Sequence, residues 1–359
     1  MSIKFIVAAS MVAAALVVTG CNASFQKPKI GIILSKLDNG FITSLQNAMF
    51  EADAIIGTDD MTMIPLDSKG DQNLQNKQID DLIGQKVQVI AVNLIKRTAA
   101  LDIIGKARGA NIPLIFFNLE PFPADMTYYD RVYYVGSIAE MAGGLQAEIA
   151  LDYWRANAGL DRNKDGIIQY VTLMGETDHP DARTRTASVK KFLDLEGQKN
   201  LALTEVTAHW SREDGKKVML QLLKTYKDQI EMVFANNDYM AIGAIDALQS
   251  EGYFDSGRFI PVLGVDATPL ALDAIEKGTM LGTVLNDVRG QGTAIMELAH
   301  GLARGQNVMQ TSIAKVTRSD GSLSPDGRYV LVPYRKVTRE NFREFKRDAK
   351  PETKMEMTQ

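Results

Sequence analysis

From Lys29 onward, short apolar runs alternate with longer stretches of helical periodicity. The runs are rich in Val and Ile and lack polar alternation, which is typical of strands buried on both faces of a parallel sheet. The predicted strands are Ile30–Leu34, Met61–Leu66, Val87–Val92, Pro113–Phe117, Ile167–Met174, Glu231–Ala235 and Pro261–Val265. The helices predicted between them include Phe41–Ile55, Asn73–Ile83, Met141–Trp154, Ala182–Leu195 and Met240–Glu251.

This order of strand, helix and strand predicts an α/β fold with parallel sheets and right-handed crossovers. The number of predicted strands is too large for one regular sheet in a chain of this length. The alternation also breaks near Phe122–Tyr134, a stretch rich in Pro and Tyr. We therefore expect two doubly wound parallel-sheet domains that meet near this stretch.

Polar residues directly follow the predicted strands. In open α/β sheets, ligands bind beyond the carboxyl ends of the strands, although single Asn and Asp residues there also cap helices. Six such sites, mostly amides and carboxylates, predict a pocket for a neutral polyol. They comprise the segment from Ser35 to Asn39, then Asn93, Asn118, the segment from Asn236 to Asp238, Asp266, and Asn286 with Asp287. The Gly-rich motifs that cradle phosphates, GxxxxGK[ST] and a strand-borne GxGxxG, do not occur.

The first 28 residues indicate export. Lys4 precedes an apolar run, Phe5–Val18, that is shorter than the roughly 20 residues of a membrane span, so residues 1–20 are interpreted as a secretory signal peptide. Val18-Thr19-Gly20-Cys21 resembles the lipobox of bacterial lipoproteins, in which the Cys carries the lipid. We expect residues 21–28 to be a lipidated tether that holds a periplasmic protein to a membrane. A plain cleaved signal followed by an incidental Cys is the alternative.

Composition narrows the function classes. The 359 residues carry a formal net charge of −4, which gives no basic surface for nucleic acid. The single cysteine excludes a disulfide framework. The chain has only three histidines, so a His-rich transition-metal site is not expected.

The segment from Asp161 to Gln169 reads D-x-N-x-D-G-x-x-Q, which is the start of an EF-hand calcium loop. The predicted Ca²⁺ ligands are the side chains of Asp161, Asn163, Asp165 and Gln169 and the carbonyl of Ile167. Position 12 is Thr172 instead of the usual Glu. Glu231 opens a strand that could lie beside Gln169–Met174, and it is the predicted source of the missing carboxylate. A metal-free Asp/Asn/Gly turn is the alternative.

The chain resembles a known family, the periplasmic D-galactose/D-glucose-binding proteins of bacterial ABC sugar transporters. The likeness runs from about Lys29 to Phe345. Besides the calcium loop, it rests on the motifs Lys36–Phe41 (KLDNGF), Phe116–Pro121 (FFNLEP), Gly175–Ala182 (GETDHPDA), Ala235–Asp238 (ANND) and Gly264–Ala267 (GVDA).

The resemblance implies a type I periplasmic binding protein fold with a three-crossing hinge near Ser137, Asn286 and Val332. The N-terminal lobe would comprise residues 29–137 plus 286–331. The C-terminal lobe would comprise 138–285 plus 332–347, followed by a tail, 348–359.

It also implies the sugar site. Phe41 and Trp210 would stack on the two faces of a pyranose, whose C–H faces are apolar and whose rim is polar. Planar amides, carboxylates and a guanidinium would bind the hydroxyls and ring oxygen. These polar residues are Asn118, His179, Asp181, Arg185, Asn237, Asp266 and Asn286.

Several of these residues also have a plainer interpretation. Phe41 could belong to the core, and Asp181 and Asn237 could be helix caps. Arg185 could form an ordinary i,i+4 ion pair with Asp181.

Two features depart from the family. Asn39 stands where the family carries an acidic residue that contacts the sugar 4-hydroxyl, so the preference between glucose and galactose is open. The stretch Gln306–Arg328 is longer than the family norm, and its sequence does not indicate a purpose.

We therefore expect a monomeric, lipid-tethered binding protein that takes a hexose to an ABC permease and does not bind nucleic acid. The alternative is a sensor that presents bound sugar to a chemoreceptor or another signalling protein. An enzyme is not expected, because no nucleophile elbow or open metal site accompanies Glu176, His179 and Asp181. A sugar-responsive repressor is not expected either, because an export signal stands where a helix-turn-helix would begin.

Overall fold

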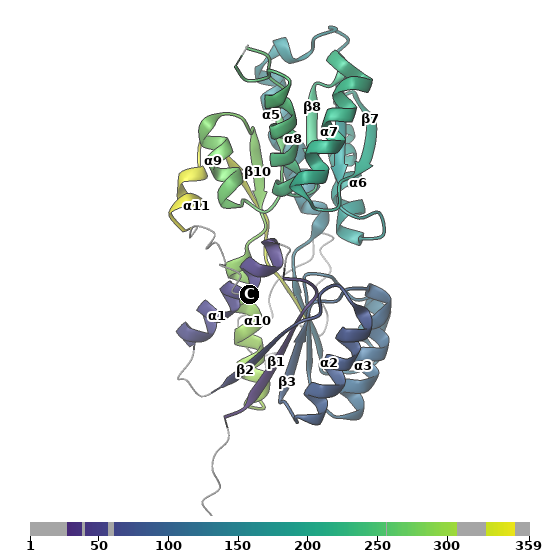
Figure 1. The fold of residues 1–359 in the computed structure, drawn as a ribbon, viewed down its shortest axis with the longest axis vertical. Helices are drawn as coiled ribbons and strands as arrows, with labels where there is room; N and C mark the ends of the chain where they lie inside the picture. The colour runs from purple at the N-terminus through teal and green to yellow at the C-terminus, as the bar shows by residue number, and fades with distance from the viewer. Residues whose placement is uncertain (1–26, 38–39, 57–60, 256, 307–327, 349–359) are drawn as a thin grey trace, which may run out of the picture.

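A computed structural model describes residues 27–37, 40–56, 61–255, 257–306 and 328–348, and structural statements below concern these residues. They form two α/β lobes, one above the other in Figure 1, each built on its own six-stranded sheet. The predicted fold class, two doubly wound parallel-sheet domains, is confirmed.

The N-terminal lobe has strand order β11-β5-β4-β3-β1-β2, and every pairing is parallel. Alternate residues of the interior strand β1 face opposite layers: Ile32 packs with α1 and α10, and Ile33 packs with α2 and α3. Both faces are therefore covered, which explains why the strands are continuous apolar runs. The elements are β1 (Lys29–Leu34), α1 (Gly40–Ile56), β2 (Thr62–Asp67), α2 (Gln72–Gly84), β3 (Val89–Val92), α3 (Ala100–Gly109), β4 (Leu114–Phe117), α4 (Pro123–Met126), β5 (Val132–Gly136), α10 (Val288–Ala303) and β11 (Tyr329–Leu331).

The C-terminal lobe has strand order β12-β10-β9-β8-β6-β7. Tyr170 of β6 packs toward α5 and α6, whereas Val171 packs toward α7, α8 and α9. The elements are α5 (Ala139–Ala156), β6 (Ile168–Met174), α6 (Pro180–Leu195), β7 (Asn200–Thr207), α7 (Arg212–Tyr226), β8 (Met232–Ala235), α8 (Asp238–Ser250), β9 (Val262–Leu263), α9 (Pro269–Lys277), β10 (Gly282–Leu285), β12 (Arg335–Thr338) and α11 (Phe342–Asp348).

The chain passes between the two sheets three times. It leaves the first sheet after β5, returns from β10 to α10, and leaves again between β11 and β12. These three segments run side by side between the lobes in Figure 1. Such a connection lets two rigid lobes rotate about a short hinge.

The structure departs from the expected pattern at three strands. The Pro- and Tyr-rich stretch does not end the first sheet, because β5 begins within it at Val132 and is fully buried. Strand β7 lies at a sheet edge and is only partly buried, so it carries no apolar run. Strand β12 pairs antiparallel with β10 and contains Arg335 and Lys336, so the second sheet is not wholly parallel.

Among the described residues, no helix combines the length and apolar character needed to cross a membrane. Cys21 and the proposed signal peptide lie outside the described residues.

Candidate functional site

The carboxyl ends of both sheets face a cleft of about 720 Å³ between the lobes. This volume lies within the range of roughly 300–1,000 Å³ that small-molecule sites occupy. The cleft is lined from both lobes, as a site at the carboxyl edges of parallel strands requires.

Nine of the ten predicted sugar-binding residues line this cleft, and the tenth, Asn39, lies outside the described residues. The N-terminal lobe contributes Phe41 from α1 and Asn118 from the end of β4. The C-terminal lobe and the second crossing contribute His179, Asp181, Arg185, Trp210, Asn237, Asp266 and Asn286.

Three of these residues have backbone conformations that non-glycine residues rarely adopt. The φ angle is 62° at Asn118, 61° at Trp210 and 115° at Asp266. Such conformations cost roughly 1–3 kcal/mol each and persist only where the surrounding structure fixes them. All three follow strands at the cleft, although positive φ angles also occur away from it, for example at Lys86 and Phe254.

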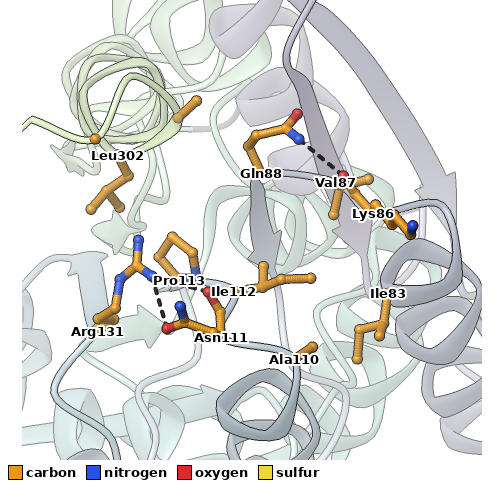
Figure 2. A pocket seen from close by; sticks show the side chains of 12 residues that line it. Ile83, Lys86, Val87, Gln88, Ala110, Asn111, Ile112, Pro113, Arg131 and Leu302 are labelled. Atoms are coloured by element: carbon orange, nitrogen blue, oxygen red, sulfur yellow. Dashed lines mark hydrogen bonds between the residues drawn. The ribbon is translucent and has the colours of Figure 1, made fainter.

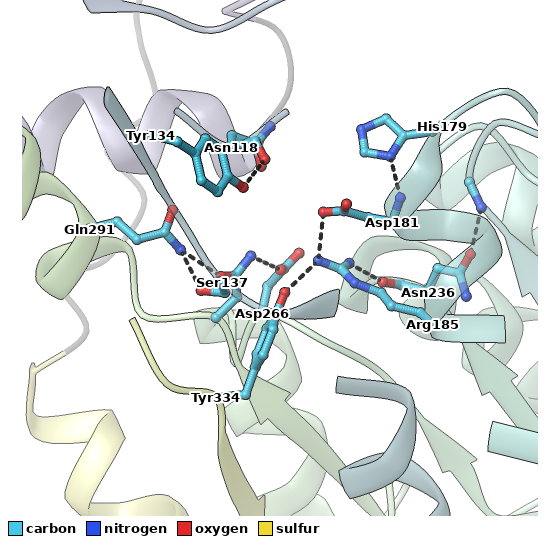
Figure 3. A network of polar contacts seen from close by, with 12 residues as sticks. Asn118, Tyr134, Ser137, His179, Asp181, Arg185, Asn236, Asp266, Gln291 and Tyr334 are labelled. Atoms are coloured by element: carbon cyan, nitrogen blue, oxygen red, sulfur yellow. Dashed lines mark hydrogen bonds and ion pairs between the residues drawn. The ribbon is translucent and has the colours of Figure 1, made fainter. Parts of the chain in front are cut away.

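Arg185 is the centre of the polar network in Figure 3. Its side chain is buried on α6, and its Nη1 donates to the carbonyl of Asn236 at 2.7 Å. Nη2 donates to the Tyr334 hydroxyl at 3.0 Å and lies 4.0 Å from Oδ2 of Asp181. Nε is buried without a partner in the described structure. The i,i+4 approach to Asp181 is present, but the guanidinium is held chiefly by Asn236 and Tyr334.

His179 is held as a hydrogen-bond donor toward the cleft. Its Nδ1 accepts the backbone N–H of Asp181 at 3.2 Å, which makes it the N-cap of α6. Burial lowers the pKa of His179, although the Asp181 carboxylate acts in the opposite direction. A neutral imidazole that accepts at Nδ1 carries its proton on Nε2, so this residue can donate to a ligand oxygen.

Asp266 is linked to the hinge through Asn286, whose Nδ2 donates to Asp266 Oδ1 at 3.3 Å. Gln291 on α10 in turn donates to Asn286 at 2.7 Å and to Ser137 at 3.2 Å. Two of the three crossings are thereby tied to a cleft carboxylate. Burial raises the pKa of Asp266 to about 7, although the Arg185 guanidinium lowers it.

The indole of Trp210 is seated against a glycine. A β-carbon built on Gly175 would overlap this ring. His179 meets the ring edge-on, with centroids 5.1 Å apart, and Glu176 accepts from the indole N–H at 3.3 Å. These contacts fix the ring plane in the cleft wall, opposite the lobe that carries Phe41.

A second pocket, of about 390 Å³, lies at the amino edge of the first sheet (Figure 2). Its wall includes Gln88, Pro113 and Arg131, which precede β3, β4 and β5, and Leu302 near the end of α10. No predicted binding residue lines it. The cleft is therefore the candidate site.

The predicted calcium loop precedes β6 at the opposite edge of the second sheet from the cleft. Gly166 has φ +71°, and Asp161 accepts from the backbone N–H groups of Asp165 and Gly166 at 3.1 and 2.9 Å. Glu231 accepts from the N–H groups of Arg162 and Gln169 at 2.9 and 3.1 Å. This places Glu231 beside the loop, because β8 pairs with β6.

One oxygen atom of this loop is suited to ligate a cation. Gln169 Oε1 is buried and has no hydrogen-bond partner, while Nε2 of the same amide donates to Asp165 at 2.7 Å. Burial raises the pKa of Glu231, and the charges of Asp161 and Asp165 add to the effect. Within the described residues, no three His, Cys, Asp or Glu side chains alone could hold a metal. Amide and carbonyl oxygens must therefore complete any site.

The sequence did not single out Tyr334, Tyr239 or Gln291. Tyr334 lies in the third crossing and meets Arg185, 149 positions earlier in the chain. Tyr239 lines the cleft two positions after the predicted residue Asn237, so adjacency to the strand-end motif that ends at Asp238 was its only signal.

Comparisons with known proteins agree with this geometry. Residues 30–307 match the periplasmic binding protein domain family. The D-galactose/methyl-galactoside binding periplasmic protein of Haemophilus influenzae is 36% identical over 338 residues, which cover 94% of this chain and 97% of that protein. A putative rhizopine-binding protein of Rhizobium meliloti is 30% identical, covering 95% of this chain and 98% of that protein.

Solved structures show the same fold. An ABC transporter solute binding protein from Bacillus halodurans with bound myo-inositol is 30% identical, with a TM-score of 0.72. The match covers 89% of this chain and 98% of that one. The chain therefore belongs to the periplasmic binding protein family, as its motifs indicate, and it is a solute-binding protein rather than an enzyme.

Proposed function

We propose that this protein captures D-glucose and/or D-galactose between its lobes in the periplasm and delivers the sugar to an ABC permease. The observation that carries the proposal is the composition of the cleft. Phe41 comes from one lobe and Trp210 from the other, and a rim of amides, carboxylates and one guanidinium surrounds them. Aromatic plates suit the apolar faces of a pyranose, and the rim suits its hydroxyls.

Each side chain has a role that its own contacts support. Arg185 is a fixed cation that donates to a ring or hydroxyl oxygen. His179 donates through Nε2, and the carboxylates of Asp181 and Asp266 accept from hydroxyls. Asn118, Asn237 and Asn286 can both donate and accept.

Closure follows from ligand contacts on both lobes. A sugar between Phe41 and Trp210 contacts both walls only when the lobes approach, so it favours the closed arrangement by its differential affinity. Asn286 and Tyr334 belong to crossings and meet Asp266 and Arg185, so the hinge and the binding side chains move as one network.

A cyclitol is the second candidate ligand. The structure with bound myo-inositol favours it, because a cyclitol has the same apolar faces and hydroxyl rim as a pyranose. Calorimetry with all three kinds of ligand decides among glucose, galactose and cyclitols.

Isothermal titration calorimetry tests the proposal. The mature chain from Asn22, which contains every element of both lobes, is titrated with D-glucose, D-galactose, D-xylose, D-ribose and myo-inositol in the presence of Ca²⁺. We expect 1:1 binding of glucose or galactose at about micromolar Kd or tighter, roughly −8 kcal/mol. Binding of myo-inositol alone would replace the hexose with a cyclitol, and binding of none of the five would overturn the site.

Ca²⁺ is proposed as a structural cofactor of the C-terminal lobe. Asp161, Asn163, Asp165, Gln169 and Glu231 would hold it with side chains, and Ile167 with its carbonyl. The orphaned amide oxygen of Gln169 supports this assignment, together with the charges of Asp161 and Asp165, which act on Glu231. The ion would neutralise repulsion among these carboxylates and fix the loop before β6.

Membrane attachment through lipid on Cys21 remains a prediction, as do the monomeric state and presentation of bound sugar to a chemoreceptor. Mass spectrometry of the protein purified from its membrane tests the anchor. A diacylglyceryl adduct on Cys21 is expected, and an unmodified cysteine would point to a plain cleaved signal.

A further inference from the structure

Gly40 and Tyr239 meet across the cleft. Gly40 is the first residue of α1 in the N-terminal lobe, and Tyr239 is the second residue of α8 in the C-terminal lobe. A β-carbon built on Gly40 would overlap the Tyr239 hydroxyl and would lie 2.5 Å from Cζ and 2.7 Å from Cε2. The tip of the phenol therefore rests on the backbone of the opposite lobe.

The position of each residue is set by a cleft residue beside it. Asn237 caps α8 by accepting from the backbone N–H of Met240 at 3.0 Å, and its Nδ2 donates to the carbonyl of Trp210 at 3.3 Å. Tyr239 is thereby fixed at the rim of the Trp210 wall. Gly40 directly precedes Phe41, so the contact joins the two aromatic walls, and both residues line the cleft.

We propose that Tyr239 is a positioning residue for closure, whose phenol seats on Gly40 when the lobes close and so sets the affinity for ligand. The proposal rests on the proposed function, since the affinity concerned is that for the sugar. The two residues lie on different lobes and touch in this structure, so opening of the cleft would separate them. A contact made in only one state shifts the equilibrium toward that state.

The steric fit gives a sharp prediction for Gly40→Ala. The φ angle of Gly40 lies outside the left-handed region, and alanine is the better helix former. The substitution should therefore leave folding intact or improve it. Its methyl group, however, occupies the place of the Tyr239 hydroxyl, so the phenol must leave its seat on the backbone or the closed lobes must separate.

The experiment is a double-mutant cycle on the mature chain from Asn22, with D-galactose, D-glucose and myo-inositol as probes. We expect Gly40→Ala to weaken binding by about tenfold and Tyr239→Ala to weaken it by about threefold. In the double variant, adding Gly40→Ala to Tyr239→Ala should weaken binding by less than roughly a further twofold. The melting temperature of Gly40→Ala should not fall. Gly105→Ala is the matched control, because Gly105 lies within α3 and a β-carbon there meets nothing within 4 Å.

Closure is measured separately with spin labels on Ser44→Cys and Lys217→Cys, exposed positions on α1 and α7. With saturating sugar, Gly40→Ala should lengthen the distance between the labels, and the double variant should restore it. Unchanged affinity in Gly40→Ala, or equal losses with and without Tyr239, would overturn the proposal. If the parent chain binds no probe, the proposed function fails, and the label distances of the ligand-free variants alone decide the contact.

Discussion

The Arg185 guanidinium donates to the Tyr334 hydroxyl at 3.0 Å. Arg185 comes from α6 in the C-terminal lobe, and Tyr334 lies in the third crossing, between β11 and β12. Burial raises the pKa of Tyr334 to about 12, although the Arg185 charge lowers it, so the phenol stays neutral and accepts at physiological pH. The cation that we propose binds the sugar is therefore oriented by the hinge itself.

Tyr334→Phe removes this acceptor and leaves a buried guanidinium with one partner fewer. Hydrogen bonds to charged groups contribute about 1.5–3 kcal/mol, and we expect the free energy of unfolding to fall by that amount. Sugar affinity should fall by about three- to tenfold, or roughly 1 kcal/mol, because Arg185 is less well oriented. Chemical denaturation and calorimetry measure the two effects.

Tyr226→Phe is the control, since the Tyr226 hydroxyl donates to the carbonyl of Leu203 at 3.1 Å and does not line the cleft. This variant should lower the free energy of unfolding by about 0.5–1.5 kcal/mol and leave the sugar affinity unchanged. Equal affinities for Tyr334→Phe and the parent chain would show that the hinge contact does not orient Arg185.

Trp210→Ala should weaken sugar binding by about 30- to 150-fold, since losing one aromatic plate removes roughly 2–3 kcal/mol of apolar contact. Gly175→Ala should weaken binding as well, because the new methyl displaces the indole. Added sugar should change the tryptophan fluorescence of the parent chain but not that of Trp210→Phe. Trp154→Phe, which replaces the other tryptophan, should keep both the sugar affinity and the fluorescence change on adding sugar. If the fluorescence change is lost in Trp154→Phe and kept in Trp210→Phe, the ligand binds elsewhere.

The central strands could be predicted because burial on both faces leaves an apolar run that needs no tertiary information. Ile30–Leu34 and Glu231–Ala235 are within one residue of β1 and β8. The edge strand β2 was still predicted from its apolar run, but the edge strands β7 and β12 have no such pattern. Only part of β7 is buried and β12 begins with Arg335 and Lys336, so nothing in their sequences separates them from loops.

Much of the candidate site was also predictable, because residues after parallel strands must gather at one edge. The contacts between these residues were not. Arg185 with Tyr334, and Gly40 with Tyr239, join segments far apart in the chain, and they depend on how the two lobes rotate onto each other. No local pattern records that rotation.

Asp266 predicts a pH dependence of binding. Its pKa, raised by burial to about 7, lies above the ordinary value of about 3.9. The native state therefore binds this proton more tightly than the unfolded state. Its contribution to stability is present below about pH 4 and is lost as the pH rises through 7.

Sugar binding should follow the opposite trend. Hydroxyls that donate to the Asp266 carboxylate favour its ionised form, so affinity should rise from pH 5 to pH 7 and level off above pH 8, by at most about tenfold per unit. Calorimetry at pH 5, 6, 7 and 8 measures it, and Asp266→Asn should flatten the profile. A parent profile that is flat over this range, or is retained in Asp266→Asn, would contradict the carboxylate's role as acceptor.

Removal of Ca²⁺ should lower stability without altering the sugar site. When the free Ca²⁺ concentration is 100 times the Kd, binding stabilises the native state by about 2.7 kcal/mol. This corresponds to a melting-temperature shift of roughly 5–10 °C for a lobe of this size. The loop lies before β6, whereas the cleft lies beyond the carboxyl ends of the strands. Sugar affinity of the folded chain should therefore change by less than about threefold, or roughly 0.7 kcal/mol.

Differential scanning calorimetry with Ca²⁺ and then with EGTA measures this shift. Asp165→Asn should reduce it, because Asp165 supplies a carboxylate to the loop and accepts from Gln169. Asp194→Asn is the matched control: Asp194 is an exposed carboxylate of the same lobe, paired with Lys190 at 2.6 Å, and its variant should keep the full shift. An equal shift in both variants would place any Ca²⁺ elsewhere, and no shift in the parent chain would leave the segment from Asp161 to Gln169 as a turn held by its own hydrogen bonds.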